Sequence, residues 1–203
     1  LVGSEMCIRD RPRAFDRDQV LQHAIRVFCD KGFAAASTEE LMQAMGLSRQ
    51  SMYNTFGDKR QLYLQAMAEY QRTGVDDLIE RLGQGPAPLQ GLHDTLNSFA
   101  TRALREGTAG CMGVNAICEF GQEDEEINQL TAHSAERLRR AFEQTLRCAQ
   151  EQGELVPGTD LPAACDFLMA TLSGMKIAGK GGASVEQLAN IAGFAVRALG
   201  AKA

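Results

Sequence analysis

The 203-residue sequence predicts an all-α protein, and three observations support this prediction. Apolar residues recur at spacings of three and four along almost the whole chain, which is the periodicity of amphipathic helices. The alternation of apolar and polar residues that would indicate strands is nearly absent. Glycine and proline fall between the periodic segments, where they end and start helices. We therefore expect about nine helices, of which three short ones are clustered at the N-terminus.

Caps and glycines set the boundaries of these helices. Gly32 supplies a C-terminal stop for the first helix. The S-x-x-E pattern at 37–40 is a capping box that starts the second helix, and Gly46 ends it. Capping patterns at 160–162 and 184–187 start the last two helices. The predicted helices are 17–31, 37–45, 48–56, 58–82, 89–106, 111–121, 124–152, 161–179 and 185–199.

Composition excludes several classes of protein. Hydrophobic residues make up 44% and charged residues 23% of the chain, as in ordinary globular proteins. No apolar run approaches the roughly 18 residues that a membrane span needs, so we predict a cytoplasmic protein without membrane contact. The six cysteines form no CxxC and no paired Cys/His spacing. We therefore predict reduced thiols, no metal site and no cofactor.

The net charge of −5 is unevenly distributed. Residues 12–70 hold seven basic and seven acidic groups, whereas residues 71–203 hold twelve basic and seventeen acidic groups. The acidic excess therefore lies in the C-terminal two-thirds, and the neutral N-terminal part can still present a local basic face to a nucleic acid.

The segment 38–56 has the pattern of a helix-turn-helix: a helix, a short turn with Gly46, and a short helix with many polar residues. In its second helix, SRQSMYNTF, Met52 and Phe56 stand four apart and should face the core. Arginine can bind guanine, and glutamine or asparagine can bind adenine, while hydroxyls and lysine suit phosphate oxygens. The pattern favours DNA binding, with an ordinary solvated helix as the alternative.

About 55 residues around this segment resemble the DNA-binding domain of TetR-family repressors. The shared landmarks, all at the family spacing, are Phe28-x-x-Lys31-Gly32-Phe33, Thr38-x-x-Leu41-x-x-x-x-Gly46-Leu47-Ser48, Tyr53-x-x-Phe56 and Lys59-x-x-Leu62. The resemblance implies a three-helix DNA-binding domain at 12–60 and a helical-bundle domain for ligand binding and dimerisation at 61–203. It further implies a homodimer that binds a palindromic double-stranded DNA operator and is released by a small-molecule inducer.

The resemblance also implies roles for single residues. The predicted base contacts are Arg49, Gln50, Ser51 and Asn54. The predicted phosphate contacts are Thr38, Ser48, Tyr53 and Lys59. Arg13, ahead of the first helix, is a candidate basic arm for phosphate or the minor groove, with an uninvolved tail as the alternative. Asn54-Thr55 stands where many relatives have a histidine, so the operator sequence cannot be copied from them.

The last two predicted helices, 161–179 and 185–199, are rich in the small and apolar residues that closely packed helices need. By resemblance they form a four-helix dimer interface, for which the candidates are Phe167, Leu168, Gly174, Leu188, Ile191 and Phe194. A core buried within one protomer would have a similar composition. The helix at 58–82 spans both domains and is the expected lever of a two-state switch.

The segment GTAGCMGVNAICEFGQEDEEI, at 107–127, is similar to a subgroup in which a cysteine opens a helix inside the ligand pocket. One branch of the family near this pattern, repressors of the N-ethylmaleimide-reductase type, senses electrophiles and oxidants through such a cysteine. A helix N-terminus favours a thiolate, which makes Cys111 a candidate sensor. Cys118, seven residues on, is expected on the same face. The alternatives are a noncovalent inducer and cysteines that only pack.

Residues 1–10, LVGSEMCIRD, have no helical periodicity and match the translation of a transposase-based sequencing adapter. We expect 1–11 to be an artefact or a disordered tail, with Arg11 belonging to either the adapter or the gene. A remote rival for the whole chain is an enzyme or small-molecule carrier built on a helical bundle. The sequence offers it no nucleophile–base pair, phosphate loop or metal cluster, so we predict that the protein is not an enzyme.

Overall fold

The computed structural model describes residues 16–105 and 111–201, and these residues form the predicted all-α fold. The predicted helix boundaries agree with the observed ones to within one residue, except that the first helix is assigned one turn beyond its predicted end. The nine helices of the described residues are α1 (Arg17–Ala35), α2 (Thr38–Met45), α3 (Arg49–Phe56), α4 (Lys59–Leu82), α5 (Pro88–Arg105), α6 (Met112–Phe120), α7 (Glu125–Glu151), α8 (Leu161–Lys180) and α9 (Val185–Leu199).

The predicted caps are present at the helix starts. The Ser37 hydroxyl accepts from the Glu40 N–H at 3.2 Å, while the Glu40 carboxylate accepts from the Ser37 N–H at 3.1 Å. This reciprocal pair is the capping box that the sequence predicted. The same arrangement starts α4 at Asp58 and α9 at Ser184, so short-range patterns place most boundaries correctly.

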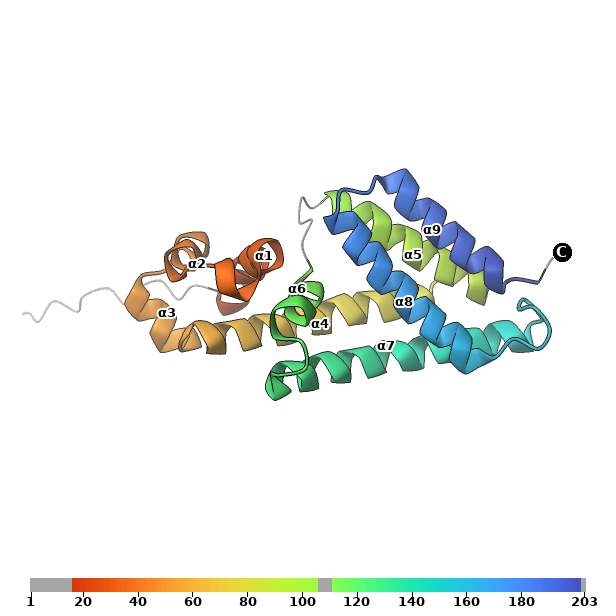
Figure 1. Cartoon of the computed structure of the whole chain (residues 1–203), viewed down its shortest axis with the longest axis horizontal. Helices are drawn as coiled ribbons and strands as arrows, with labels where there is room; N and C mark the ends of the chain where they lie inside the picture. The colour runs from red at the N-terminus through yellow and green to blue at the C-terminus, as the bar shows by residue number, and fades with distance from the viewer. Residues whose placement is uncertain (1–15, 106–110, 202–203) are drawn as a thin grey trace, which may run out of the picture.

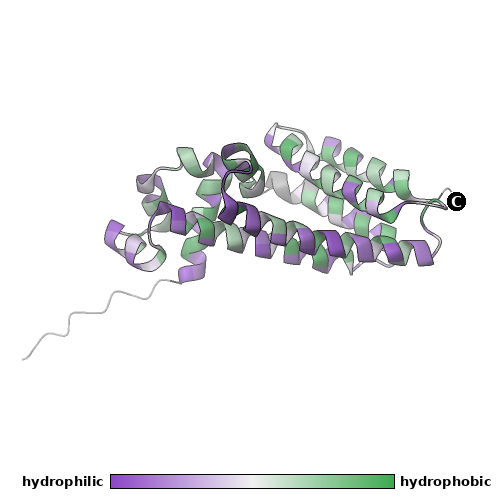
Figure 2. Cartoon of the chain, turned by 60° about the horizontal axis from the view of Figure 1, so that its bottom comes forward, coloured by the Kyte–Doolittle hydropathy of each residue, from purple (hydrophilic) through white to green (hydrophobic). Residues whose placement is uncertain are grey.

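Helices α1, α2 and α3 form a head at one end of the molecule, and α5, α7, α8 and α9 form a body at the other (Figure 1). Helix α4 begins beside α3 and runs from the head into the body. Helix α6 lies between the two parts and contacts α1, α4, α7 and α8. Hydrophilic and hydrophobic residues alternate along the helices, as amphipathic packing requires (Figure 2).

Two hydrophobic clusters support this arrangement. The cluster of the head contains α1, α2, α3 and the first half of α4, together with Met112 and Ala116 from α6 and Ile127 from α7. The cluster of the body contains the second half of α4 and helices α5, α7, α8 and α9. Helix α4 therefore belongs to both clusters, and α6 packs into that of the head.

Helix α1 is interrupted inside its assigned length. Gly32 has φ 77° and ψ −173°, which is not a helical conformation, and a further helical turn then reaches Ala35. The predicted stop at Gly32 is therefore confirmed: the first helical segment ends there, and the assigned length of α1 reaches Ala35 only because a short second turn follows the kink. This backbone region is open almost only to glycine, which explains the residue type at this position.

No helix of the described residues is long and apolar enough to cross a membrane.

Candidate DNA-binding site

The turn between α2 and α3 is closed by backbone bonds. Gly46 has φ 64° and ψ 29°, in the left-handed region, and the Leu47 N–H donates to the Met42 carbonyl at 3.1 Å. This bond satisfies a carbonyl at the end of α2 and turns the chain sharply. Ser48 then caps α3, because its hydroxyl accepts from the Ser51 N–H at 3.2 Å. The turn and the cap together fix the angle between α2 and α3.

Helix α3 has one buried and one exposed face. Met52 and Phe56 are 0% and 2% exposed, which confirms the prediction that they face the core. Arg49, Gln50 and Asn54 are exposed: Gln50 and Asn54 lie on the side opposite Met52 and Phe56, and Arg49 is the first residue of the helix. The Gln50 Nε2 donates to the Asn54 Oδ1 at 3.0 Å, so the two amides lie together on that face. Amide and guanidinium groups grouped in this way can reach the edges of bases in a major groove.

The residues predicted to contact bases or phosphate differ in their surroundings. Tyr53 is 45% exposed, and the Ser48 hydroxyl donates to the Ser51 hydroxyl at 3.0 Å beside it on the N-terminal turn of α3. Thr38, at the start of α2, is half-buried. The Lys59 ammonium lies 4.5 Å from the centroid of the Phe33 ring, at the start of α4. Thr38, Ser48 and Lys59 therefore lie at the starts of three helices, where backbone N–H groups also favour anions, whereas Tyr53 lies within α3.

Arg13, the predicted arm residue, lies outside the described residues. The first basic residue within them is Arg17, whose guanidinium carbon is 5.2 Å from the centroid of the Phe56 ring. Arg17 also donates to Gln65, whose own Nε2 donates to the Phe56 carbonyl at 2.9 Å. These contacts fix the C-terminal end of α3 against α1 and α4.

An ion pair that the sequence did not predict joins the start of α4 to the start of α7. Arg60 donates to both carboxylate oxygens of Asp124, at 2.7 and 3.0 Å, and to Glu126 at 3.2 Å. The hydrogen bond from Arg60 lowers the pKa of the Asp124 carboxyl below its ordinary value. Since Arg60 follows Lys59, this pair connects the candidate phosphate-binding end of α4 to the body.

Two polar residues of α6 reach α1, and the sequence analysis missed both. The Asn115 side chain is buried, and its Nδ2 donates to the carbonyls of Phe28 at 3.1 Å and Cys29 at 2.9 Å. The Glu119 carboxylate accepts from the Phe33 N–H at 2.7 Å. The available indication was an asparagine inside the otherwise apolar stretch MGVNAI, because a buried amide needs hydrogen-bond partners.

The two candidate sensor cysteines do not share a face, which corrects the prediction. Cys111 is 6% exposed, whereas Cys118 is exposed. The spacing of seven residues fails because Cys111 precedes α6 in an extended conformation, with φ −123° and ψ 119°, and so lies outside the helical repeat. The Tyr70 hydroxyl donates to the Cys111 sulfur at 3.3 Å. Cys111 thereby contacts α4.

A third cysteine lies close to these residues in α1. Cys29 is buried, and burial raises the pKa of its thiol to about 12. At neutral pH it is therefore a thiol rather than a thiolate, and thiolates are the nucleophiles. Cys29 packs in the core of the head and is not a candidate sensor.

The predicted dimer interface divides into two groups. Leu168 and Leu188 are both 0% exposed and belong to the core of the body, so neither can contact a partner, which corrects the prediction for them. Phe167, Ile191 and Phe194 are 41%, 39% and 67% exposed, and Gly174 is exposed as well. The prediction failed for the leucines because α8 is apolar on two faces, so that composition could not separate the interface from the core.

Residues of α8 and α9 line an open groove of about 360 Å³. Its lining is mostly apolar and consists of Phe167, Thr171, Asn190, Ile191, Phe194 and Ala195. We call this surface the α8–α9 face. Exposed apolar residues of this size gathered in one place are typical of a protein–protein interface.

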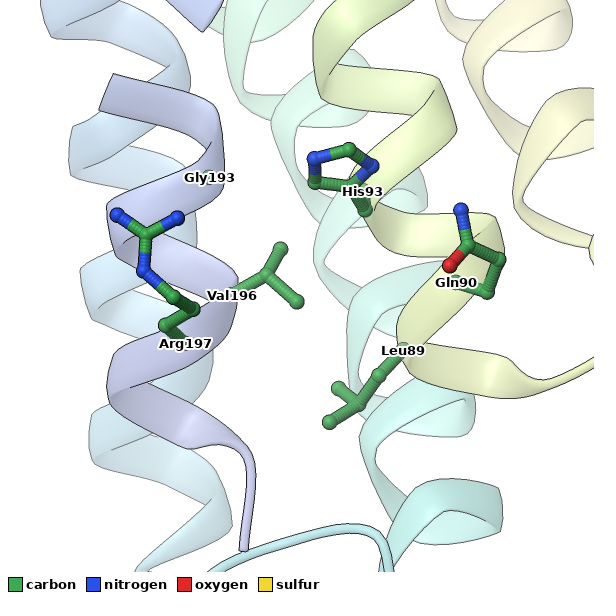
Figure 3. Close-up of a pocket in the computed structure, with 6 residues that line it drawn as sticks. All are labelled: Leu89, Gln90, His93, Gly193, Val196 and Arg197. Atoms are coloured by element: carbon green, nitrogen blue, oxygen red, sulfur yellow. The ribbon is translucent and has the colours of Figure 1, made fainter. Parts of the chain in front are cut away.

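A second pocket lies between α5 and α9 at the side of the body (Figure 3). Leu89 and Val196 form its apolar part, and Gln90, His93 and Arg197 line it with polar groups, beside Gly193. Its volume is about 220 Å³ and it is open to solvent. This pocket lies at the edge of the bundle.

A helix-turn-helix with an exposed polar recognition helix, held on a helical body, defines a DNA-binding regulator. Comparison with known proteins agrees with this class. The family of bacterial regulatory proteins, tetR family, matches residues 20–66, and the tetracyclin repressor-like C-terminal domain matches residues 85–190. The chain belongs to the TetR family of helix-turn-helix transcriptional regulators. The enzyme and carrier alternatives are thereby set aside.

Relatives of known name are similar over nearly their whole length. The HTH-type transcriptional repressor ComR of Escherichia coli is 29% identical over 199 residues, which are 96% of this chain and 95% of ComR. The repressor BdcR of Escherichia coli is 28% identical over 190 residues, 93% and 91% of the two chains. A cysteine mutant of the TetR-family regulator CifR, solved with 26-base-pair operator DNA, is 29% identical with a TM-score of 0.80, covering 93% and 99%.

Proposed function

We propose that this protein is a homodimeric repressor that binds a palindromic operator and is released from it by a small-molecule inducer. The observation that supports DNA recognition most directly is the exposed surface of α3, which presents Arg49 at the start of the helix and Gln50 and Asn54 opposite the buried Met52 and Phe56. These three side chains are of the types that read bases, and Ser51 stands beside them. Two such helices in a symmetric dimer would enter successive major grooves.

The α8–α9 face supports the homodimer. A symmetric dimer needs one self-complementary patch on each copy. Phe167, Ile191 and Phe194 give that patch exposed apolar and aromatic side chains, which are common at the centres of interfaces. The exposed Gly174 lets a partner helix approach closely. Helix α8 also contacts α7 and α6, so the two heads of a dimer would be spaced by the body.

Release by an inducer is supported by the continuity of α4. This helix contributes Leu62 and Met67 to the core of the head and Leu78 and Leu82 to the core of the body. A ligand that binds one arrangement of the body more tightly would shift the spacing of the two heads through this helix. A mobility-shift titration with the DNA upstream of the protein's own gene tests the proposal, and absence of a specific complex would contradict it.

The assigned contacts predict two different losses. Arg49→Ala should reduce discrimination at one base pair of each half-site by about 1–3 kcal/mol, since only a base contact is removed. Lys59→Ala should instead weaken binding to all sequences alike. The substitution removes two phosphate contacts per dimer. The slope of log K against log salt concentration should therefore become smaller by about 1.8, at about 0.9 per phosphate. Titrations of operator variants at several salt concentrations measure both effects.

The matched control for Lys59 is Arg72→Ala. Arg72 lies in the same helix but is paired with Glu69 at 2.8 Å and with Asp76 at 3.3 Å, outside the head. This variant should keep both affinity and salt slope. An unchanged salt slope in Lys59→Ala would show that Lys59 serves the Phe33 contact alone and does not bind phosphate.

The position of Cys111 favours a second mode of induction, in which an electrophile modifies this thiol. The sulfur lies at the start of α6 and accepts from the Tyr70 hydroxyl of α4, so an added group there would push apart α4 and α6.

If Cys111 is a sensor, N-ethylmaleimide should modify it faster than it modifies free cysteine, and operator binding should be lost in step with that reaction. Mass spectrometry of peptides taken during the reaction gives the rate at each cysteine. Cys111→Ser should keep operator binding after treatment, whereas Cys118→Ser should remain sensitive. A Cys111 rate no greater than that of free cysteine would leave a noncovalent inducer as the only mode of release.

A further inference from the structure

The break in α1 separates a backbone donor from its usual acceptor. In a continuous helix the Phe33 N–H would donate to the Cys29 carbonyl four residues earlier. Because Gly32 has a positive φ, the Phe33 N–H is directed elsewhere and donates to the Glu119 carboxylate at 2.7 Å. The Cys29 carbonyl accepts from the Asn115 amide at 2.9 Å. Two side chains of α6 therefore bind the donor and the acceptor on either side of the break.

These two side chains act from one face of α6. Asn115 and Glu119 stand four residues apart in the helix, so their side chains are neighbours. Phe120, the next residue, adds an aromatic contact, with its ring centroid 5.6 Å from that of Phe33. The end of α1 is therefore held to α6 by polar groups at the backbone and by an aromatic pair beside it.

The Asn115 amide is shared with α8. Its nitrogen donates both hydrogens to α1, to the carbonyls of Phe28 and Cys29. Its oxygen accepts from the ammonium of Lys180, in the last turn of α8. A buried amide with donors and acceptor all engaged is rigidly oriented, because any rotation would leave a buried polar group without a partner.

We infer that Asn115, Glu119 and Lys180 form a clasp that fixes the end of α1 to α8 and thereby sets the orientation of the head for operator binding. This inference rests on the proposed function, in which α8 belongs to the dimer interface. The three are positioning residues and do not themselves touch DNA. A ligand that displaces α6 would open the clasp, free the end of α1 and release the operator.

Three variants, one at Asn115 and two at Glu119, test the clasp. Asn115→Asp keeps the shape and the Lys180 contact but removes both donors and places an oxygen against two carbonyls. Glu119→Ala removes the acceptor of the Phe33 N–H, whereas Glu119→Gln retains an oxygen that can accept from it. We expect Asn115→Asp and Glu119→Ala to lower operator affinity about tenfold or more, as for a buried group that loses its partner. Glu119→Gln should restore most of it.

Lys180→Met tests the connection to α8. It leaves the Asn115 donors in place and should lower affinity less than Asn115→Asp does. The matched control is Lys176→Met, one turn earlier in the same helix, which should bind operator like the wild type.

Amide hydrogen exchange of residues 28–36 in the full-length protein separates this inference from the proposed function. The clasp predicts faster exchange there in Asn115→Asp and Glu119→Ala, with an unchanged oligomeric state. Unchanged exchange would overturn the inference, and so would faster exchange with wild-type operator affinity.

If the wild type itself bound no operator DNA, the proposed function would fail, and with it the role of the clasp in orienting the head. The exchange rates would then still decide whether the clasp holds α1. If Asn115→Asp fails to fold, the Glu119 pair gives the answer alone.

Discussion

Phe194→Asp is expected to give a folded monomer that no longer binds operator DNA at concentrations where the wild type is saturated. Phe194 is the most exposed of the large hydrophobic residues of the α8–α9 face, at 67%. Its exposure means that the protomer alone gains little from it, so the substitution should leave the fold intact. In a dimer the same position would bury an unpaired carboxylate in an apolar contact.

The size of this effect follows from symmetry. An aromatic residue at the centre of an interface typically accounts for about 2 kcal/mol or more. A two-fold dimer contains the substitution twice, so the free energy of dimerisation should become less favourable by about 4 kcal/mol. The dissociation constant of the dimer should then increase about a thousandfold. Sedimentation or light scattering against concentration measures the dimer constant, and circular dichroism reports whether the fold is kept.

Val156→Asp provides the control, because Val156 is 43% exposed but lies in the connection after α7 and is not among the residues that line the groove of Phe167 and Phe194. This variant should remain dimeric and bind operator normally. A Phe194→Asp protein that stays dimeric would place the interface elsewhere. One that becomes monomeric yet binds operator with wild-type affinity would contradict the proposed two-headed mode of recognition.

The sequence predicted the helices well because their boundaries depend on neighbouring residues. Ser37, Asp58 and Ser184 each cap a helix through a residue three positions later, and Gly46 ends α2 by its own backbone conformation. The inward position of Met52 and Phe56 likewise follows from a spacing of four. Such interactions are contained in a few consecutive residues, and the family resemblance extended them to the helix-turn-helix.

The contacts that join the head to the body could not be predicted in this way. Asn115 and its acceptors in α1 are 86 and 87 residues apart, and Arg60 lies 64 residues from Asp124. Nothing local in the sequence specifies these pairs, because they depend on how α6 and α7 pack against α1 and α4. The sequence also could not predict which face of α8 is turned towards the core. Phe167 and Leu168 are adjacent and both apolar, yet Phe167 is exposed and Leu168 is buried.

Gly32→Ala is expected to lower both stability and operator affinity. At φ 77° and ψ −173° a side chain is strained, at a cost of about 1–3 kcal/mol. A Cβ at this position would also overlap the carboxylate of Glu119, which would have to move away from the Phe33 N–H. The thermal midpoint should fall by about 2–4 °C for each kcal/mol in a chain of this length. Differential scanning calorimetry and operator titration measure the two losses.

Gly74→Ala is the matched control, because Gly74 lies within helix α4 and a Cβ there would meet nothing within 4 Å. Alanine is the better helix former, so this variant should be as stable as the wild type or more so. The double variant Gly32→Ala/Glu119→Ala separates the two causes: removing the carboxylate relieves the overlap but leaves the backbone strain. If strain alone mattered, the two single losses would add. A double variant less destabilised than that sum would show that the Glu119 carboxylate and a side chain at position 32 compete for the same space, and an unaffected Gly32→Ala protein would contradict both causes.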